Sequence, residues 1–304
     1  MTQALISPQH QHYQEQVESL KQSVYMDYPN HIHIETLALC PAACSFCPYP
    51  TLERKGTRMS DALIDKIFSD LSDIPKHIPL QISPFKVNEP FMDKRMLSIL
   101  KRINSELPQA QITLTTNTTP LTPKKLAELQ AIENLQYIWV SLNDYRSEHY
   151  EKTMALSWAR TQERLQMLHR AKDRGRLTTE VILSRVGDNS FNDQRFQEWV
   201  KETFPLFQSF VFPRGGWLGQ VDAFAGTSAL MDVPNVGCVR WFELSITASG
   251  TVAHCCMDGK AEWPIGDINT QHILDVYNHP TYRQLREKTL SRHDTSPCNT
   301  CTFL

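Results

Sequence analysis

The sequence predicts an α/β fold, namely an open, partial (β/α)6 TIM-like barrel followed by a small hairpin-helix extension. Short β-branched or aromatic segments alternate about six times with longer amphipathic ones, which is typical of a parallel sheet with right-handed crossovers. After residue 212 this alternation ends, and a glycine-rich stretch follows, PRGGWLGQVDAFAG. The 304 residues suffice for one large domain and a small one.

The barrel elements follow in order along residues 31–212. The polar residues 1–30 before them predict a helical lead-in. The predicted strands cover 31–37, 79–84, 111–115, 136–141, 178–184 and 207–212. The predicted helices lie between them, at 60–72, 93–106, 122–131, 157–174 and 190–203. Ser60, Asp93 and Thr122 stand where helix N-caps are expected.

Residues 213–304 are predicted to form a linker and a small second region. The segments 242–247 and 251–255 indicate a β-hairpin around Ser249 and Gly250, and helical segments follow. A region of this size builds little core alone and usually needs a metal or a partner surface.

Composition excludes several classes of protein. The net charge of −2 gives no basic field for nucleic acid. The apolar runs fall short of the roughly 20 residues that span a bilayer. The N-terminal stretch MTQALISPQHQHYQEQ lacks the apolar core of a signal peptide. We therefore expect a cytoplasmic protein, in which eight cysteines indicate metal or redox chemistry rather than disulfides.

Three cysteines, Cys40, Cys44 and Cys47, lie within eight residues directly after the first predicted strand. In a parallel barrel this position is the C-terminal rim, where active sites lie. Three thiolates can hold three corners of a cubane iron–sulfur cluster and leave the fourth iron open to an exogenous ligand.

The alternative for this loop is a zinc site with His31 or His33 as the fourth ligand. Both histidines belong to the first predicted strand and alternate with isoleucines. They are therefore expected to face one side of the strand together rather than to reach the loop.

The CX3CX2C spacing, with Phe46 just before the third cysteine, resembles the signature of the radical SAM enzymes. The resemblance implies a [4Fe-4S] cluster whose open iron chelates S-adenosylmethionine (SAM). It also implies that one-electron cleavage of SAM yields a 5′-deoxyadenosyl radical, which abstracts a substrate hydrogen atom. The backbone of Phe46 would then lie near the adenine, and a flavodoxin- or ferredoxin-type protein would donate the electron.

Further strand ends match the family by position. Glu89, in KVNEPFMD, would accept hydrogen bonds from the SAM ammonium group, although Asn88 stands where the family has a glycine. The stretch LTTNTTPLT resembles a Thr-Asn-Gly segment with Thr118 in place of the glycine. The resemblance implies a set of SAM-binding residues made of Glu89, Asn117, Ser141, Asn143 and Arg185.

The C-terminal region carries the other five cysteines. Four of them offer one site with sulfur ligands from three separated segments, which are Cys238, Cys255, Cys298 and Cys301. This arrangement resembles the shortened SPASM, or twitch, extension of radical SAM enzymes and implies one auxiliary [4Fe-4S] cluster. The spacing alone also fits a structural four-cysteine zinc site.

One cysteine of the adjacent pair Cys255 and Cys256 is surplus. Neighbouring residues of a strand point to opposite faces, so only one of the two easily reaches the same metal. The position relative to Gly250 favours Cys255 as the ligand. Cys256 is then either a small buried group or a hydrogen-atom donor to a substrate radical, which would make the net reaction an epimerisation.

A fully ligated auxiliary cluster favours electron transfer and hence a net two-electron oxidation. The resemblance includes dehydrogenases of aminocyclitols and amino sugars, and also enzymes that crosslink, epimerise or rearrange ribosomal peptides. No leader-binding domain is visible ahead of residue 31, which favours a small substrate unless a separate partner protein delivers a peptide. Candidate substrate contacts on the rim are Lys86, Arg214 and Trp217. A hypothesis from another class is a non-catalytic iron–sulfur or zinc protein that senses redox state or binds a partner.

Overall fold

The computed structural model describes residues 8–221 and 233–303. Within them the strands form one nine-stranded sheet in the order β6-β5-β4-β3-β2-β1-β7-β8-β9. The strands are β1 (His31–Ile34), β2 (Leu80–Ser83), β3 (Ala110–Thr116), β4 (Leu135–Ser141), β5 (Glu180–Gly187), β6 (Gln208–Pro213), β7 (Glu243–Ile246), β8 (Thr251–Ala253) and β9 (Pro264–Asp267). Strands β1 to β6 are parallel to their neighbours, which confirms the predicted partial barrel.

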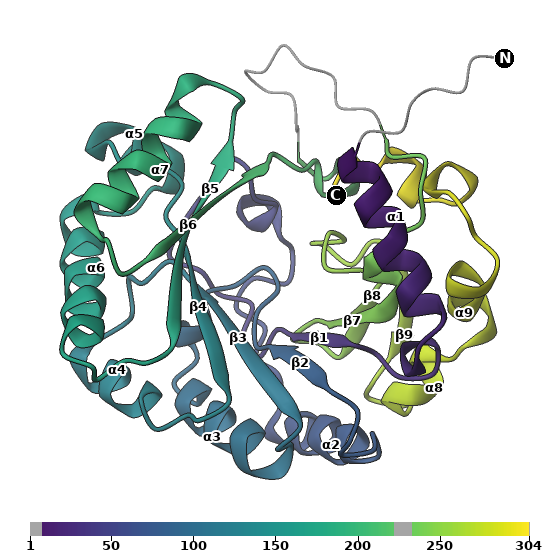
Figure 1. The fold of residues 1–304 in the computed structure, drawn as a ribbon. Coiled ribbons are helices and arrows are strands. Elements are labelled where there is room, and N and C mark those ends of the chain that lie inside the picture. The colour runs from purple at the N-terminus through teal and green to yellow at the C-terminus, as the bar shows by residue number, and fades with distance from the viewer. Residues whose placement is uncertain (1–7, 222–232, 304) are drawn as a thin grey trace, which may run out of the picture.

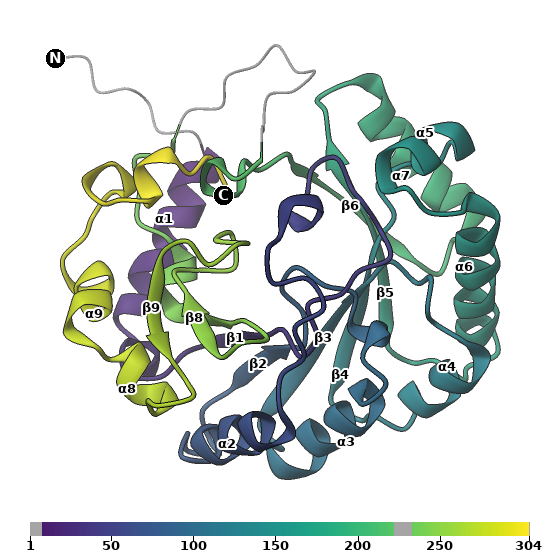
Figure 2. The same ribbon diagram turned by 180° about the vertical axis from the view of Figure 1, so that it is seen from behind.

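Helices cover the outer face of the curved sheet (Figures 1 and 2). The α-helices are α1 (Pro8–Lys21), α2 (Asp61–Ser72), α3 (Met96–Glu106), α4 (Pro123–Leu129), α5 (Ser147–Met154), α6 (Trp158–Asp173), α7 (Phe191–Thr203), α8 (Ile273–Tyr277) and α9 (Pro280–Glu287). In the described part of the chain, none of them has the length and apolar character that a bilayer span requires.

The predicted barrel elements are found within a few residues, and two of the three N-caps are confirmed. The Ser60 hydroxyl accepts from the backbone N–H of Leu63 at 3.1 Å, and Thr122 caps α4 in the same way. The prediction for Asp93 is wrong, because α3 begins at Met96 and its N-cap is Arg95. The Asp93 carboxylate instead accepts from the backbone N–H of Arg95 and pairs with its guanidinium group.

The C-terminal region continues the barrel sheet. The predicted hairpin is confirmed, since β7 and β8 are antiparallel and Gly250 takes a φ of +90° in the turn between them. Strand β7 also runs parallel to β1, with His31 opposite Glu243. The region therefore gains its core by adding to the edge of the barrel, a pairing that the sequence did not predict.

The alternation of β1 sorts its side chains between two faces. Ile32 and Ile34 belong to the main hydrophobic core. The rings of His31 and His33 lie together on the other face with centroids 4.1 Å apart, as expected. Since the helices cover the outer face, both histidines lie on the inner face of the barrel.

Helix α1 confirms the predicted helical lead-in and packs against the C-terminal region. Its side chains Tyr13 and Val17 share a buried cluster with Cys238, Trp241 and Cys298. The two ribbon views agree that α1 lies beside this region (Figures 1 and 2). The N-terminal helix therefore covers the site of the C-terminal cysteines.

Candidate active site

The three-cysteine loop follows β1 at the C-terminal end of the barrel strands, and its thiols are neighbours. Burial is the main cause that raises the pKa of Cys40 to about 12 and that of Cys47 to about 11. Burial and the nearby Cys47 and Cys40 likewise raise the pKa of Cys44. The thiols are therefore protonated without a metal, and a cation that binds them must displace the protons and supply compensating charge.

The end of α5 supports this loop. The backbone N–H of Ala43 donates to the carbonyl of Met154 at 3.0 Å, and that of Ser45 donates to Thr153 at 3.2 Å. The Cys44 thiol lies 3.5 Å from the Met154 sulfur. Helix α5, which the sequence did not predict, thus holds the loop in place.

The structure gives no support to a zinc site completed by a histidine. His31 Nε2 lies 2.8 Å from Ser83 Oγ, and His33 Nε2 lies 3.1 Å from Glu243 Oε2. Both histidines therefore have hydrogen-bond partners on neighbouring strands of the barrel. The metal ligands that the loop offers are its three cysteines, as a cubane with one open iron requires.

Glu89 is a buried carboxylate beside the loop, with 1% of its surface exposed. Its oxygens accept from the Thr116 hydroxyl at 2.8 Å, the Asn117 backbone N–H at 2.7 Å and the Phe91 backbone N–H at 3.3 Å. Burial nevertheless raises its pKa to about 7. It forms no ion pair within residues 8–221 and 233–303, so an incoming ammonium group would supply the missing counter-charge.

Two residues stand where the family has glycine, and both are accommodated. Thr118 takes a φ of +65°, so the left-handed backbone that favours glycine is kept. The Asn88 side chain accepts from the backbone N–H of Lys86 at 2.9 Å. Asn117, next to Thr118, has its amide nitrogen 3.6 Å from Cys40 Sγ and therefore lies against the cysteine loop.

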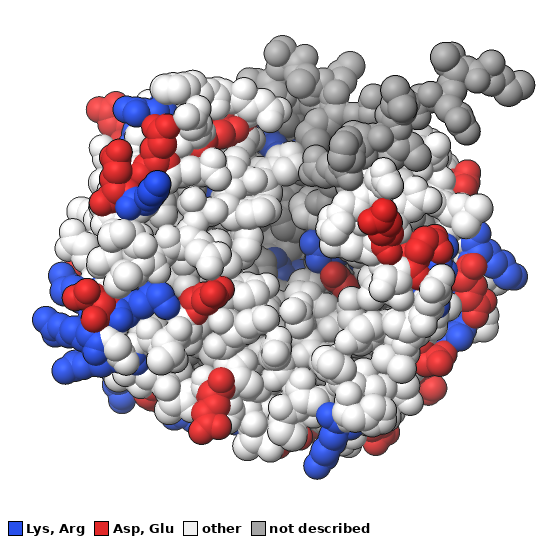
Figure 3. Space-filling view, viewed as in Figure 1, with Lys and Arg blue, Asp and Glu red and all other residues white. Residues whose placement is uncertain are grey.

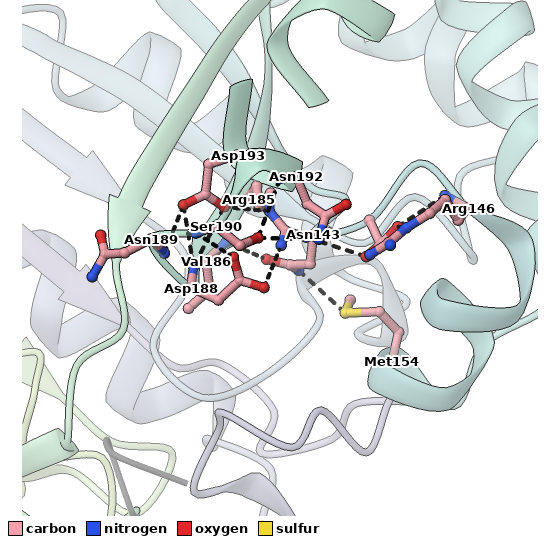
Figure 4. A network of polar contacts seen from close by, with 11 residues as sticks. Asn143, Arg146, Met154, Arg185, Val186, Asp188, Asn189, Ser190, Asn192 and Asp193 are labelled. Carbon is pink, nitrogen blue, oxygen red and sulfur yellow. Dashed lines mark hydrogen bonds and ion pairs between the residues drawn. The ribbon is translucent and has the colours of Figure 1, made fainter. Parts of the chain in front are cut away.

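Arg185 is surrounded by protein acceptors (Figure 4). Its Nε donates to Asp193 at 2.7 Å, its Nη1 to the carbonyl of Asn143 at 2.6 Å and its Nη2 to Asp188 at 3.0 Å. Asp144 also lies 3.2 Å from Nη1. These contacts indicate that Arg185 fixes the loops after β4 and β5, and they leave its predicted contact with the SAM carboxylate without direct support.

Asn143 links the ends of β4 and β5. It takes a φ of +69°, donates to Ser141 Oγ at 2.8 Å and accepts from the Val186 backbone N–H at 3.0 Å. Its amide also lies 3.2 Å from the sulfur of Met154. Ser141 and Asn143 are thus brought together next to the support of the cysteine loop, while their contact with SAM stays a prediction.

The three candidate substrate contacts have protein partners. Trp217 Nε1 donates to the carbonyl of Phe46 at 2.9 Å, and Arg214 donates to the carbonyl of Ser45 at 3.0 Å, so both hold the cysteine loop. Lys86 is buried, and its ammonium group contacts one hydroxyl and two carbonyls of the C-terminal region, those of Ser245, Asp258 and Cys255.

Four C-terminal cysteines line one cavity. They are Cys238, Cys255, Cys298 and Cys301, the set expected from the resemblance. Cys256 is not among the described residues around this cavity. The electrostatic neighbours of its thiol are Arg240, Glu243, Lys86 and Cys238, two of which, Arg240 and Cys238, also line the cavity. Both cysteines lie in the turn after β8, which ends at Ala253, so the expected strand alternation does not apply to them. The cavity lining nevertheless separates them, since it includes Cys255 and not Cys256.

Two arginines that the sequence analysis did not single out line the same cavity. Arg292 is fully buried, and Arg240 is partly buried. Arg292 Nη2 and Arg240 Nε have no hydrogen-bond partner among the residues that the structure describes. Buried cationic donors without partners fit an anionic group that offers acceptors, such as a four-thiolate cluster with its inorganic sulfides.

The cysteine sulfurs of this cavity also have polar neighbours. Trp241 Nε1 donates to Cys298 Sγ at 3.4 Å, and His254 Nε2 lies 3.2 Å from the same sulfur. The Tyr13 hydroxyl lies 3.5 Å from Cys238 Sγ. Hydrogen bonds to the sulfurs tune a cluster's potential. No spacing in the sequence marks these residues, because they come from segments far apart in the chain.

Comparisons with known structures agree with this fold. BtrN in complex with AdoMet and 2-DOIA is 18% identical, covers 90% of this chain and 93% of its own, and has a TM-score of 0.61. Streptococcus suis SuiB bound to the precursor peptide SuiA is 15% identical over 99% of this chain and 76% of its own, with a TM-score of 0.67. AnSMEcpe with bound AdoMet and the Cp18Cys peptide is 11% identical over 84% and 81%, with a TM-score of 0.59. No curated protein matches the sequence.

Family models cover both parts of the site. The SPASM model, an iron–sulfur cluster-binding domain, matches residues 238–302, which include all five C-terminal cysteines. The Radical SAM superfamily model matches residues 34–202, more than half of the chain. The barrel domain accordingly binds a [4Fe-4S] cluster with SAM, and the SPASM domain binds an auxiliary iron–sulfur cluster. The chain is therefore an enzyme that belongs to the radical SAM superfamily.

Proposed function

We propose that this radical SAM enzyme removes two hydrogens from a small polar substrate of the amino-sugar or cyclitol class. The observation that carries the proposal is the set of four cysteines around one cavity, joined by Arg240 and Arg292. Four thiolates leave no iron open for substrate, and the two guanidinium groups stabilise added negative charge. Such a site is suited to accept an electron.

With the auxiliary site as electron acceptor, both electrons and both hydrogens of the oxidation are accounted for. A reducing protein of the flavodoxin or ferredoxin type supplies the electron that cleaves SAM, and the resulting 5′-deoxyadenosyl radical takes one substrate hydrogen atom. The substrate radical then gives a proton to a base of the protein and an electron to the auxiliary site, which leaves a carbonyl or imine. BtrN, seen with AdoMet and the small molecule 2-DOIA, has the same fold and supports a substrate of this size.

The chain's residues divide between the two sites in this proposal. Cys40, Cys44 and Cys47 hold the cluster that binds SAM. Glu89 accepts the SAM ammonium group, because it is a buried carboxylate without an ion pair in the described structure. The residues proposed to line the remainder of the SAM site are Phe46, Asn117, Ser141 and Asn143, while Arg185 positions the last of these.

The test uses anaerobically reconstituted enzyme with dithionite, SAM and a panel of aminocyclitols and amino sugars. We expect about eight iron atoms per chain, from two cubanes. We also expect a substrate-stimulated release of 5′-deoxyadenosine and a product that lacks two hydrogens. A product with the mass of the substrate in ordinary water, and one deuterium heavier in heavy water, would instead indicate epimerisation; loss of this product in Cys256→Ser would identify Cys256 as the hydrogen donor.

A ribosomal peptide is the second candidate substrate. SuiB was seen with its precursor peptide, and its fold matches 99% of this chain. In that case a peptide, presented by a separate partner protein, would stimulate 5′-deoxyadenosine release while the aminocyclitol panel would not. The same assay therefore separates the two substrate classes.

A further inference from the structure

A polar cluster crosses the inner face of the barrel between the auxiliary cavity and β3. Glu243 of β7 faces His33 of β1 at 3.1 Å, and His31 lies 2.8 Å from Ser83 of β2. Ser83 in turn is hydrogen-bonded to Thr113 of β3. None of these side chains has a role in the SAM site described above. Figure 3 shows a hollow near the middle of the molecule, with basic and acidic side chains in it.

Arg240 joins this cluster to the auxiliary site. Its Nη1 lies 2.8 Å and 3.1 Å from the two carboxylate oxygens of Glu243. The same side chain lines the cavity of the four cysteines, and its Nε has no partner in the described part of the structure. One guanidinium group therefore contacts the carboxylate that holds His33 and also lines the cavity of the proposed electron acceptor.

His33 has the features of a general base. Its imidazole is buried, and Glu243 orients it through Nε2. Burial is the main cause that lowers its pKa, so the ring is neutral near pH 7 and can accept a proton. The charged groups that act on the two imidazoles are Lys86, Arg240 and Glu243, besides the imidazoles themselves. Tyr137 and Cys256 interact with the same Arg240 and Glu243.

We propose that His33 accepts the proton in the oxidation, and that Glu243 and Arg240 couple it to the auxiliary site, so that proton and electron uptake favour each other. This inference rests on the proposed function. The substrate radical gives its proton to the His33 ring and its electron to the auxiliary site, which forms the carbonyl or imine. Charge added at the auxiliary site stabilises the imidazolium, and the reverse holds by linkage.

The coupling can be measured without substrate. The Cys40→Ala, Cys44→Ala, Cys47→Ala variant keeps only the auxiliary cluster, whose reduction potential is followed by EPR. We expect reduction to raise the pKa of His33. His33 therefore has a lower pKa when the auxiliary cluster is oxidised and a higher pKa when it is reduced. Between these two pKa values the reduction potential of the cluster should fall as pH rises, and outside them it should not depend on pH.

Further substitutions in the triple-cysteine variant identify the imidazole that causes this pH dependence of the reduction potential. His33→Gln should remove it, whereas His31→Gln should keep it, because His31 lies on the same strand but bonds to Ser83. Glu243→Gln keeps His33 but removes the carboxylate between this ring and Arg240. The slope should therefore move to lower pH, since the carboxylate raises the His33 pKa, and span a narrower pH range, since the coupling is weaker. This variant keeps the test valid if His33→Gln does not fold.

The outcomes separate the inference from the proposed function. A potential that does not depend on pH overturns the inference, as does a slope that survives His33→Gln or vanishes in His31→Gln instead. A slope caused by His254, which contacts Cys298, would survive His33→Gln and is thereby recognised. Absence of any iron–sulfur EPR signal in this variant would instead refute the auxiliary electron acceptor on which the proposed function depends.

Discussion

Replacing Glu89 by glutamine tests the SAM site most specifically. The carboxylate is buried and accepts three hydrogen bonds, yet it has no ion pair in the described structure. A hydrogen bond to a charged partner contributes about 1.5–3 kcal/mol. Loss of the pairing with the SAM ammonium group should therefore weaken SAM binding by about 10- to 150-fold.

The assay is equilibrium binding of SAM to reconstituted enzyme without oxygen, with iron measured on the same samples. Thr116→Val is the matched control, because it removes one donor to Glu89 but keeps the charge. It should bind SAM with less than about a tenfold loss, because the carboxylate that attracts the SAM ammonium group is kept. The glutamine amide also meets the Asn117 N–H, so the melting temperature is recorded to separate misfolding from lost binding.

The pH dependence gives an independent check. The pKa of Glu89 is raised to about 7, and only its ionised form attracts a cation. SAM affinity of the parent enzyme should therefore increase as pH rises through about 7 and then level off, whereas Glu89→Gln should lack this rise. Unchanged SAM affinity in Glu89→Gln, with full iron content, would refute the role assigned to this carboxylate.

Three further changes test the other assignments. Cys298→Ala should lower iron from about eight to about four atoms per chain and keep slow cleavage of SAM, since it removes only an auxiliary ligand; loss of SAM cleavage would contradict this. Cys256→Ser should keep all the iron, because this thiol lies outside the cysteine cavity; a loss of about four iron atoms would make it a ligand. Arg185→Lys should lower the free energy of unfolding by about 3 kcal/mol in denaturant titrations, because it breaks partly buried ion pairs with three carboxylates. A large loss of SAM affinity with unchanged stability would restore the direct contact.

Local sequence signals predicted much of the fold and the chemistry. The spacing of Cys40, Cys44 and Cys47 is a property of one loop, so it could be recognised without the rest of the chain. The six barrel strands were also visible, because a buried parallel strand is a short continuous apolar run. Ser60 and Thr122 were recognisable because a cap depends on residues three positions away.

Long-range packing could not be predicted in this way. The pairing of β1 with β7 joins residues more than 200 positions apart, and it places Glu243 beside His33. Arg185 is another example, because its acceptors come from the loop after β4, the loop after β5 and the first turn of α7. Sequence position suggested a ligand contact for it, whereas the structure shows a side chain committed to neighbouring carboxylates.

The assignment of the first cluster to the loop after β1 has one direct measurement. Release of 5′-deoxyadenosine is compared between the parent enzyme and the Cys40→Ala, Cys44→Ala, Cys47→Ala variant, each reduced with dithionite in the presence of SAM. We expect the variant to lose all SAM cleavage while it keeps about four iron atoms per chain in the auxiliary site. Continued release of 5′-deoxyadenosine by the variant would show that SAM is bound and cleaved elsewhere.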